Sequence, residues 1–164
     1  MKEEKNYWMI LCNPLKWYEG TELYQVNSLL MNLDEEFWKI NGRTVYNFLK
    51  IGDKGIIKVG VDKRTNKDRY NTKMKIIENK LNTGIYATFE IVSNKKENNH
   101  RRQYINNLGK IESFAHIKID NNFFKKEIIE KDRAIEILGQ NTFNTKSSKR
   151  ITQKQYEDVI LEKI

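Results

Sequence analysis

Three tryptophans near the beginning of the chain are the residues best suited to recognise a ligand. Trp8, Trp17 and Trp38 surround a turn at Asn13-Pro14. An aromatic face can stack on a nucleobase, while the amides and carbonyls of a polar turn can hydrogen-bond the edge of that base. Such stacking contributes about 1–3 kcal/mol per base. The pattern predicts a base-binding pocket near Trp17 and Trp38, whereas Trp8 lies inside an apolar run and is expected in the core.

Groups that could catalyse a reaction do not form a recognisable catalytic pattern. The 8 glycines are scattered, so no glycine-rich phosphate loop is present. Cys12 is the only cysteine; at the end of an apolar strand it is expected in the core rather than as a nucleophile activated by His116. The acidic run 34–36 falls on successive helical positions, which point in different directions. Glu90 and the pair Lys95 and Glu97 lack the spacing of a restriction nuclease. We therefore expect neither an enzyme nor a bound metal or cofactor.

The charge of the chain favours a polyanionic partner. Lys and Arg number 30 and Asp and Glu 22, which gives a formal net charge of +8. A basic surface of this kind is typical of nucleic-acid binding. The chain has no apolar run approaching the roughly 20 residues of a membrane helix, and its N-terminus does not resemble a signal peptide, so a cytoplasmic protein without membrane contact is expected.

Hydrophobic periodicity indicates a single α+β domain over residues 1–164. Two basic stretches, about 62–83 and 94–107, are predicted to be loop excursions, the first with a short helix at 72–79. Because strands and helices do not alternate, we expect a small, mostly antiparallel β-barrel flanked by helices. Strands are predicted at 7–12, 56–59, 85–92 and 114–119. Helices are predicted at 21–38, 43–49 and 122–138, and Gly139 is expected to end the third of these. A last helix is predicted to begin after an N-cap at Thr152.

Five segments in the same order resemble the EVE domain family, a PUA-like group related to YTH domains. The first strand and turn carry a Tyr-Trp pair and an Asn-Pro turn, and a later turn reads Lys-Ile-Gly-Asp. The chain departs from the family after that turn, where Lys58-Val59-Gly60-Val61-Asp62 replaces aromatic or His-Ser residues. The resembling segments are 7–17, 38–49, 50–57, 84–92 and 148–156.

The resemblance implies a PUA-like barrel that holds a modified base, most often a modified cytosine in DNA, in an aromatic pocket. EVE domains commonly serve as the reader part of modification-dependent restriction systems. The family pattern implies that Asn13 and Pro14 form the rim of the pocket and Trp17 and Trp38 its walls. Asn amides and Arg guanidinium groups suit base edges and phosphates. The remaining implied residues are Asn41 and Asn47 for the base, and Arg43, Lys63, Arg64, Lys67, Arg69, Lys73, Arg101 and Arg102 for phosphates.

Three other functions remain open on the sequence alone. An RNA-binding protein of the same fold has no residue pattern that separates it from a DNA-binding one. A module of a mobile element that contacts a host or effector protein requires no nucleic acid at all. A nuclease or deaminase that uses Asp62 or Glu90 is the third of these functions.

Overall fold

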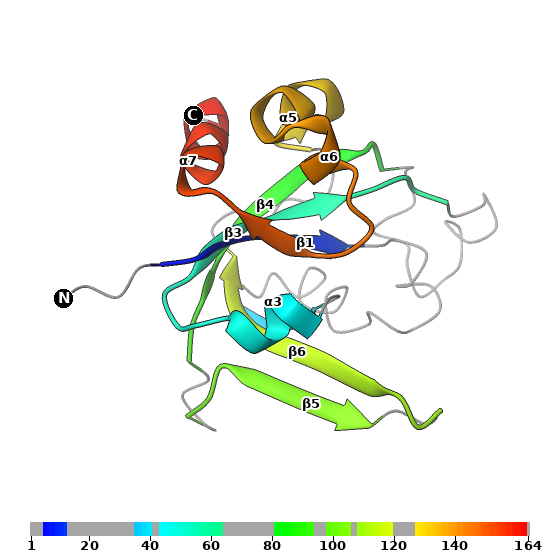
Figure 1. Cartoon of the computed structure of the whole chain (residues 1–164), viewed down its shortest axis with the longest axis vertical. Coiled ribbons are helices and arrows are strands. Elements are labelled where there is room, and N and C mark those ends of the chain that lie inside the picture. Colours follow the sequence, from blue (N-terminus) through cyan, green and yellow to red (C-terminus); the bar gives the residue numbers. More distant parts are fainter. Residues whose placement is uncertain are drawn as a thin grey trace.

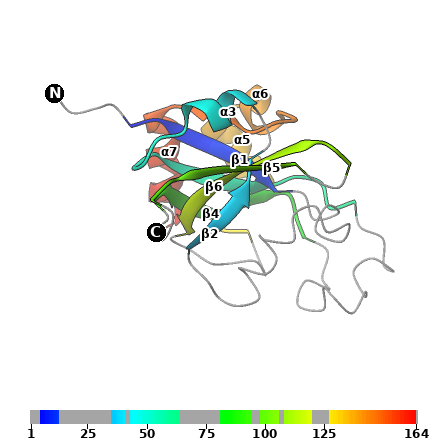
Figure 2. The same cartoon turned by 90° about the horizontal axis from the view of Figure 1, so that it is seen from below.

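The fold is a curled mixed β-sheet, half of a barrel, with short helices packed against it (Figures 1 and 2). The structure is a computed structural model. It describes residues 5–12, 35–40, 43–63, 81–93, 98–105, 108–119 and 127–163. The strands are β1 (Tyr7–Cys12), β2 (Glu35–Lys39), β3 (Lys54–Val59), β4 (Gly84–Ile91), β5 (Arg101–Ile105), β6 (Ile111–Ile119), β7 (Ile129–Glu130) and β8 (Lys149–Ile151). The helices are α3 (Arg43–Phe48), α5 (Lys131–Leu138), α6 (Gln140–Phe143) and α7 (Gln153–Lys163).

The strands follow the order β2-β6-β4-β3-β1-β8, with β5 paired to β6 and β7 paired to β4. All pairings between the described strands are antiparallel except one, in which β1 and β3 run parallel from Tyr7 opposite Lys54 to Cys12 opposite Val59. The predicted α+β class and mostly antiparallel sheet are therefore confirmed for the described residues. This parallel pair, which lies inside the sheet between β4 and β8, was not predicted.

Strand β1 is covered on both faces, as its unbroken apolar run predicts. Trp8 and Ile10 join one buried cluster, to which α3 contributes Val45, whereas Met9 joins a second cluster formed with α5, α6 and α7. Figure 1 shows α3 on one side of β1 and the other three helices on the opposite side. Alternate residues of an extended strand point to opposite faces, which explains the division. The core thus places α3 alone on one face of the central strands.

Strands β1 and β3 approach each other closely at Gly55. A Cβ atom at this position would collide with the backbone carbonyl of Trp8 and with the ring of Phe89. Glycine is required here by close packing rather than by an unusual backbone angle. The absence of a side chain at Gly55 therefore lets β3 lie close against β1 at Trp8.

The end of α5 and the start of α7 lie where the sequence predicts. Gly139 follows α5 with φ +86°, and its N–H donates to the carbonyl of Ile135. The Thr152 hydroxyl accepts from the N–H of Gln155 at 3.1 Å, and the Gln155 side chain accepts from the N–H of Thr152 at 2.8 Å. These reciprocal bonds are a capping box, and they confirm the predicted start of α7.

Three predicted boundaries are wrong. Residues 35–38, assigned to the end of a helix, belong to β2, because Glu35–Lys39 pairs along β6; residues 21–34 lie outside the described part. The stretch 94–107, assigned to a charged loop, contains β5, an outer strand on which charged side chains can reach water. The helix expected over 122–138 begins only at Lys131, because Ile129–Glu130 pairs with β4 as β7.

Within the described residues, no helix is long and apolar enough to cross a membrane.

Candidate functional site

A buried carboxylate fixes the position of the first tryptophan. Asp53 follows Gly52, whose φ of +93° favours glycine, and its side chain is only 1% exposed. The carboxylate accepts the Trp8 indole N–H at 2.9 Å, the Lys50 N–H at 2.9 Å and the Asn6 N–H at 3.0 Å. The Lys-Ile-Gly-Asp turn of the sequence therefore connects the segment after α3 to β1 and sets the orientation of the Trp8 ring.

Helix α3 is attached to the start of β5 through its last carbonyls. The Arg101 guanidinium donates to the carbonyls of Tyr46 at 3.2 Å and Asn47 at 3.1 Å, and it lies 5.4 Å from the centroid of the Tyr46 ring. The His100 ring nitrogen Nε2 lies 3.1 Å from the carbonyl of Leu49. A cation near the C-terminal carbonyls of a helix is favourable, because those carbonyls carry partial negative charge. These contacts give Arg101 a structural role in addition to its predicted role at phosphate.

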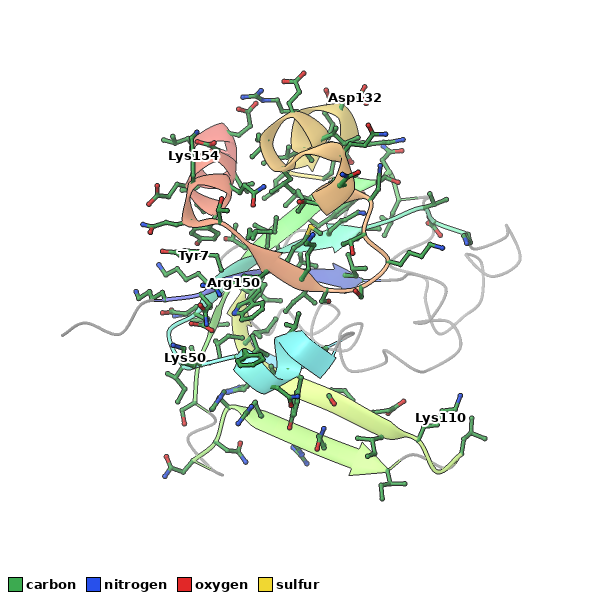
Figure 3. The ribbon with its side chains drawn as sticks, viewed as in Figure 1. Tyr7, Lys50, Lys110, Asp132, Arg150 and Lys154 are labelled. Atoms are coloured by element: carbon green, nitrogen blue, oxygen red, sulfur yellow. The ribbon has the colours of Figure 1, made fainter. Side chains whose placement is uncertain are left out.

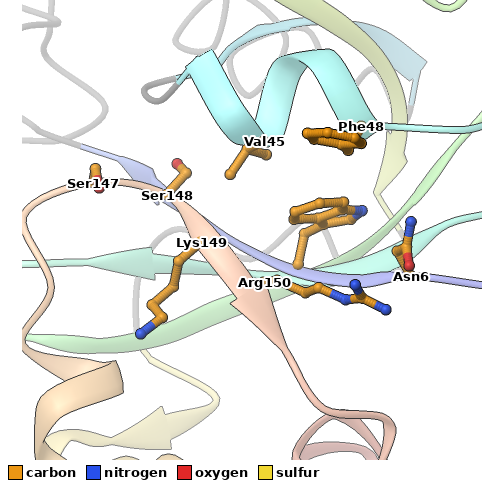
Figure 4. A pocket seen from close by; sticks show the side chains of 8 residues that line it. Asn6, Val45, Phe48, Ser147, Ser148, Lys149 and Arg150 are labelled. Carbon is orange, nitrogen blue, oxygen red and sulfur yellow. The ribbon is translucent and has the colours of Figure 1, made fainter.

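A cavity of about 460 Å³ lies between α3, β1 and β8 (Figure 4). On the α3 side the aromatic ring of Phe48 is 62% exposed, although it borders the cavity. The volume falls in the roughly 300–1,000 Å³ range of small-molecule sites. The residues that line the cavity are Asn6, Trp8, Val45, Phe48, Ser147, Ser148, Lys149 and Arg150.

Strand β8 brings one cation to the same side as Trp8. Arg150 pairs with Trp8 across β1 and β8, so both side chains project from the face that α3 covers. Figure 4 shows the Arg150 guanidinium near Asn6 at one end of the cavity. Lys149 pairs with Met9 and points away from α3 in the same view, so it borders the cavity without directing its charge into it. Arg150 is therefore the cation best placed to meet a ligand.

The opposite end of the cavity carries hydroxyl groups. Ser147 is exposed and Ser148 is buried, and Figure 4 shows both beside the N-terminal half of α3. The Ser148 oxygen accepts a hydrogen bond from the N–H of Leu11 at 3.1 Å. A hydroxyl that accepts in this way keeps its own proton for donation. The cavity thus combines aromatic surface, a guanidinium group and a hydroxyl donor.

The structure brings some of the predicted site residues together. Trp38 pairs with Ala115, which also pairs with Arg101, so the three form one row across β2, β6 and β5. Asn47 is exposed on α3, and its carbonyl meets Arg101. The backbone pairings therefore connect Trp38 to Arg101 through β6, and Arg101 connects this row to Asn47 on α3.

The other predicted residues are distributed differently. Arg43 begins α3, Lys63 is exposed beyond β3, and Arg102 lies in β5. The roles proposed for them stay predictions. Asn13, Pro14, Trp17, Asn41, Arg64, Lys67, Arg69 and Lys73 lie outside the described residues.

None of the eight residues that line the cavity was predicted to be a site residue. Trp8 is 2% exposed, which confirms the expected core position, yet it also borders the cavity. Phe48, Ser148 and Arg150 stand within the segments that resemble EVE domains, but no role was assigned to them. The sequence gives little indication of a role for them, because Phe48 beside Leu49 and Arg150 beside Ile151 fit an ordinary amphipathic surface equally well.

Two buried ionisable groups are bonded to backbone carbonyls rather than directed at the cavity. The Lys58 ammonium donates to the carbonyl of Phe143 and lies 4.1 Å from the centroid of that ring. Burial, with a smaller contribution from Lys131, lowers the pKa of Lys58. The Tyr86 hydroxyl donates to the carbonyl of Asn82 at 2.6 Å, and burial together with Glu127 raises the pKa of Tyr86. Both groups therefore connect separate parts of the fold rather than facing a ligand in the cavity.

Within the described ranges, no three His, Cys, Asp or Glu side chains are grouped so as to hold a metal ion. Cys12 is buried, as predicted from its position in the apolar strand.

No protein-family model and no curated protein matches the chain. Among solved structures, it is similar to a hypothetical protein from Leishmania major, with a TM-score of 0.58. The match has 13% sequence identity and covers 99% of this chain and 97% of the other. At this identity the similarity shows a shared fold, in which nearly all of both chains takes part.

Proposed function

We propose that this protein binds nucleic acid and holds a single base in the cavity between α3, β1 and β8. One observation carries the proposal: three of the EVE-like segments, far apart in the sequence, border this one cavity. They contribute Trp8, Phe48 and Arg150. On the same ground we infer that the curled sheet is a PUA-like barrel of the EVE type and that the protein is a reader rather than an enzyme.

The side chains of the cavity have the chemistry that a base and its phosphate require. The exposed ring of Phe48 offers a face for stacking, which contributes about 1–3 kcal/mol per base. The guanidinium of Arg150 can form paired hydrogen bonds with a phosphate or with the edge of a base. The Ser148 hydroxyl, fixed by the N–H of Leu11, can donate to a carbonyl or ring nitrogen. The net charge of +8 supplies affinity for the backbone without sequence preference.

The base that we propose is a modified cytosine in DNA, following the EVE resemblance. The protein then acts alone or recruits an effector protein to the marked site. Binding to short duplexes containing cytosine or one of several modified cytosines, and to the matching RNA, tests this directly by fluorescence anisotropy at two salt concentrations. We expect the tightest binding to one modified DNA duplex and a steep loss of affinity with salt.

Two variants test the cavity itself. Phe48→Ala should weaken binding to the preferred duplex roughly 5- to 150-fold, which corresponds to the loss of about 1–3 kcal/mol of stacking. Arg150→Gln should weaken binding and reduce its salt dependence. Leu161→Ala is the matched control, because Leu161 is also an exposed apolar residue, 69% accessible, but lies on α7.

The possible outcomes separate the competing functions. If wild type prefers RNA of the same sequence, the protein is an RNA reader that uses the same pocket. If wild type binds no nucleic acid even at low salt, the base-binding proposal is wrong and a protein-interaction module becomes the better explanation. If Phe48→Ala and Arg150→Gln bind as wild type does, the base lies elsewhere.

A further inference from the structure

The hairpin formed by β5 and β6 carries an apolar tip that the core does not use. Ile105 and Ile111 pair across the two strands at its end, and Leu108 lies in the connection. These side chains are 75%, 66% and 81% exposed, respectively. We refer to the three as the hairpin tip. Figures 1 and 2 both place the hairpin at the margin of the described part of the molecule.

Three large aliphatic side chains clustered in water call for an explanation. Single exposed apolar residues are ordinary, but a contiguous group commonly marks a contact surface. The pairing of β5 with β6 explains why the backbone is extended here, but it does not explain why the side chains are aliphatic. A hairpin at the edge of a sheet usually carries polar and charged side chains. The tip is therefore a candidate for contact with another molecule.

The surroundings of the tip favour a polyanion. Figure 3 shows Lys110 at the turn end of the hairpin, whereas Arg101 and Arg102 begin β5 at its other end. Glu112 is the one acidic residue in the described part of the hairpin, 101–105 and 108–119. An apolar tip with a lysine beside it and two arginines further along the same hairpin suits a duplex, whose phosphates attract the cations while its stacked bases accept the aliphatic groups.

Hydrogen bonds connect the start of β5 to α3, which borders the cavity. Arg101, at the base of β5, bonds the carbonyls of Tyr46 and Asn47, and the next residue, Phe48, borders the cavity. Ile105 is four residues further along β5, which at about 3.3 Å per residue is roughly 13 Å. Successive bases of one strand of DNA are about 3.4 Å apart along the helix axis. The tip and the residue that anchors α3 are thus close enough for one duplex to contact both while a base extruded from its stack enters the cavity.

We propose that the hairpin tip is a wedge that enters the base stack of a duplex beside the base held in the cavity. The inference rests on the proposed function. Extruding a base breaks stacking and pairing at a cost of a few kcal/mol, and an inserted Ile or Leu side chain offsets that cost by occupying the vacated space. Aliphatic side chains at the end of a rigid hairpin have the shape and polarity for this role.

A second copy of the chain fits the tip less well. Stable protein interfaces bury about 800 Å² on each partner, over some 20–30 residues. The tip offers three apolar residues on a narrow hairpin with Lys110 beside them. A duplex requires no such area, because its phosphates supply most of the affinity.

The test compares wild type with the triple variant Ile105→Thr, Leu108→Ser and Ile111→Thr. Threonine keeps the β-propensity of the two strand positions, so the hairpin should persist, and circular dichroism verifies it. Anisotropy measures binding to the preferred modified duplex and to the same modified strand without its complement. A 2-aminopurine placed next to the modified base reports unstacking in the duplex.

We expect the triple variant to bind the duplex at least about tenfold more weakly, to bind the single strand as wild type does, and to lose the 2-aminopurine signal. Leu161→Ser serves as the control for removing an exposed aliphatic side chain from α7.

Three results would overturn the wedge. The first is an unchanged duplex affinity of the triple variant, and the second is an equal loss for duplex and single strand. The third is wild-type self-association, seen by sedimentation, that the variant abolishes while duplex binding persists; the tip then binds a second copy. In all three, wild type still binds nucleic acid, so the proposed function survives. Failure of wild type to bind any nucleic acid overturns both proposals together.

Discussion

Replacing Asp53 by alanine should lower the free energy of unfolding by about 3–5 kcal/mol. The change removes the acceptor of three hydrogen bonds, from the Trp8 indole and from the backbone N–H groups of Asn6 and Lys50. A buried donor left without an acceptor costs about 1–3 kcal/mol. The indole N–H bears the full penalty because it is buried, while the two half-buried backbone groups recover part of theirs from water. The total is large against the roughly 5–15 kcal/mol that stabilises a whole domain.

Equilibrium urea unfolding followed by circular dichroism measures the effect of Asp53→Ala. Asp53→Asn should fall between alanine and wild type, because its one oxygen can still accept from both Trp8 and Lys50 while the amide group opposes the Asn6 N–H. Asp158→Ala is the control: its exposed i, i+4 pair with Lys154, at 3.1 Å, is worth about 0.5 kcal/mol or less. A cost below about 1 kcal/mol for Asp53→Ala would refute the view that this carboxylate organises the site.

Other predictions concern the packing and ionisation of the fold. Gly55→Ala should cost about 1–3 kcal/mol through collision with β1, whereas Gly60→Ala, with no atom within 4 Å of the added methyl group, should stay within about 0.5 kcal/mol in the same unfolding assay. Thr152→Ala should cost about 1 kcal/mol by removing the acceptor for Gln155; an unchanged urea midpoint would show that the capping box is not stabilising. Because burial holds the pKa of Lys58 below 10.5, the unfolded chain binds more protons than the folded one as pH approaches that value. Wild type should therefore gain stability relative to Lys58→Met between pH 7 and pH 10, and a constant difference between the two proteins contradicts this.

Local sequence patterns predicted the elements that depend on local interactions. The apolar run 7–12, the short helix that became α3 and the capped start of α7 all follow from residues close to one another in the chain. The errors came from pairing over long distances. Arg101–Ile105 is too charged to be recognised as a strand until β6 is placed beside it, and Ile129–Glu130 is extended because β4 lies next to it. The parallel pairing of β1 with β3 has no local signal at all.

The candidate cavity does not lie where the sequence predicted the base pocket. The aromatic character and the base-binding hypothesis came from Trp8, Trp17 and Trp38. The cavity takes only Trp8 of these among the described residues, and it adds Phe48 and Arg150 from later segments. Composition cannot show that β8 pairs with β1, and that pairing is what brings Arg150 opposite Trp8.

Strand β8 is the last strand in the sequence, and its place beside β1 has a consequence for how a ligand could be found. The cavity is built from residues near positions 6–8, 45–48 and 147–150, and the pairing of Ile151 with Tyr7 holds the wall formed by 147–150 in place. Any molecule that fits it must therefore bind the fully folded chain and not a partly folded one. A ligand at about 100 times its Kd raises the free energy of global unfolding by about 2.7 kcal/mol. Melting temperature consequently becomes a detector of occupancy, and nucleosides and short oligonucleotides can be screened by the heat resistance they confer.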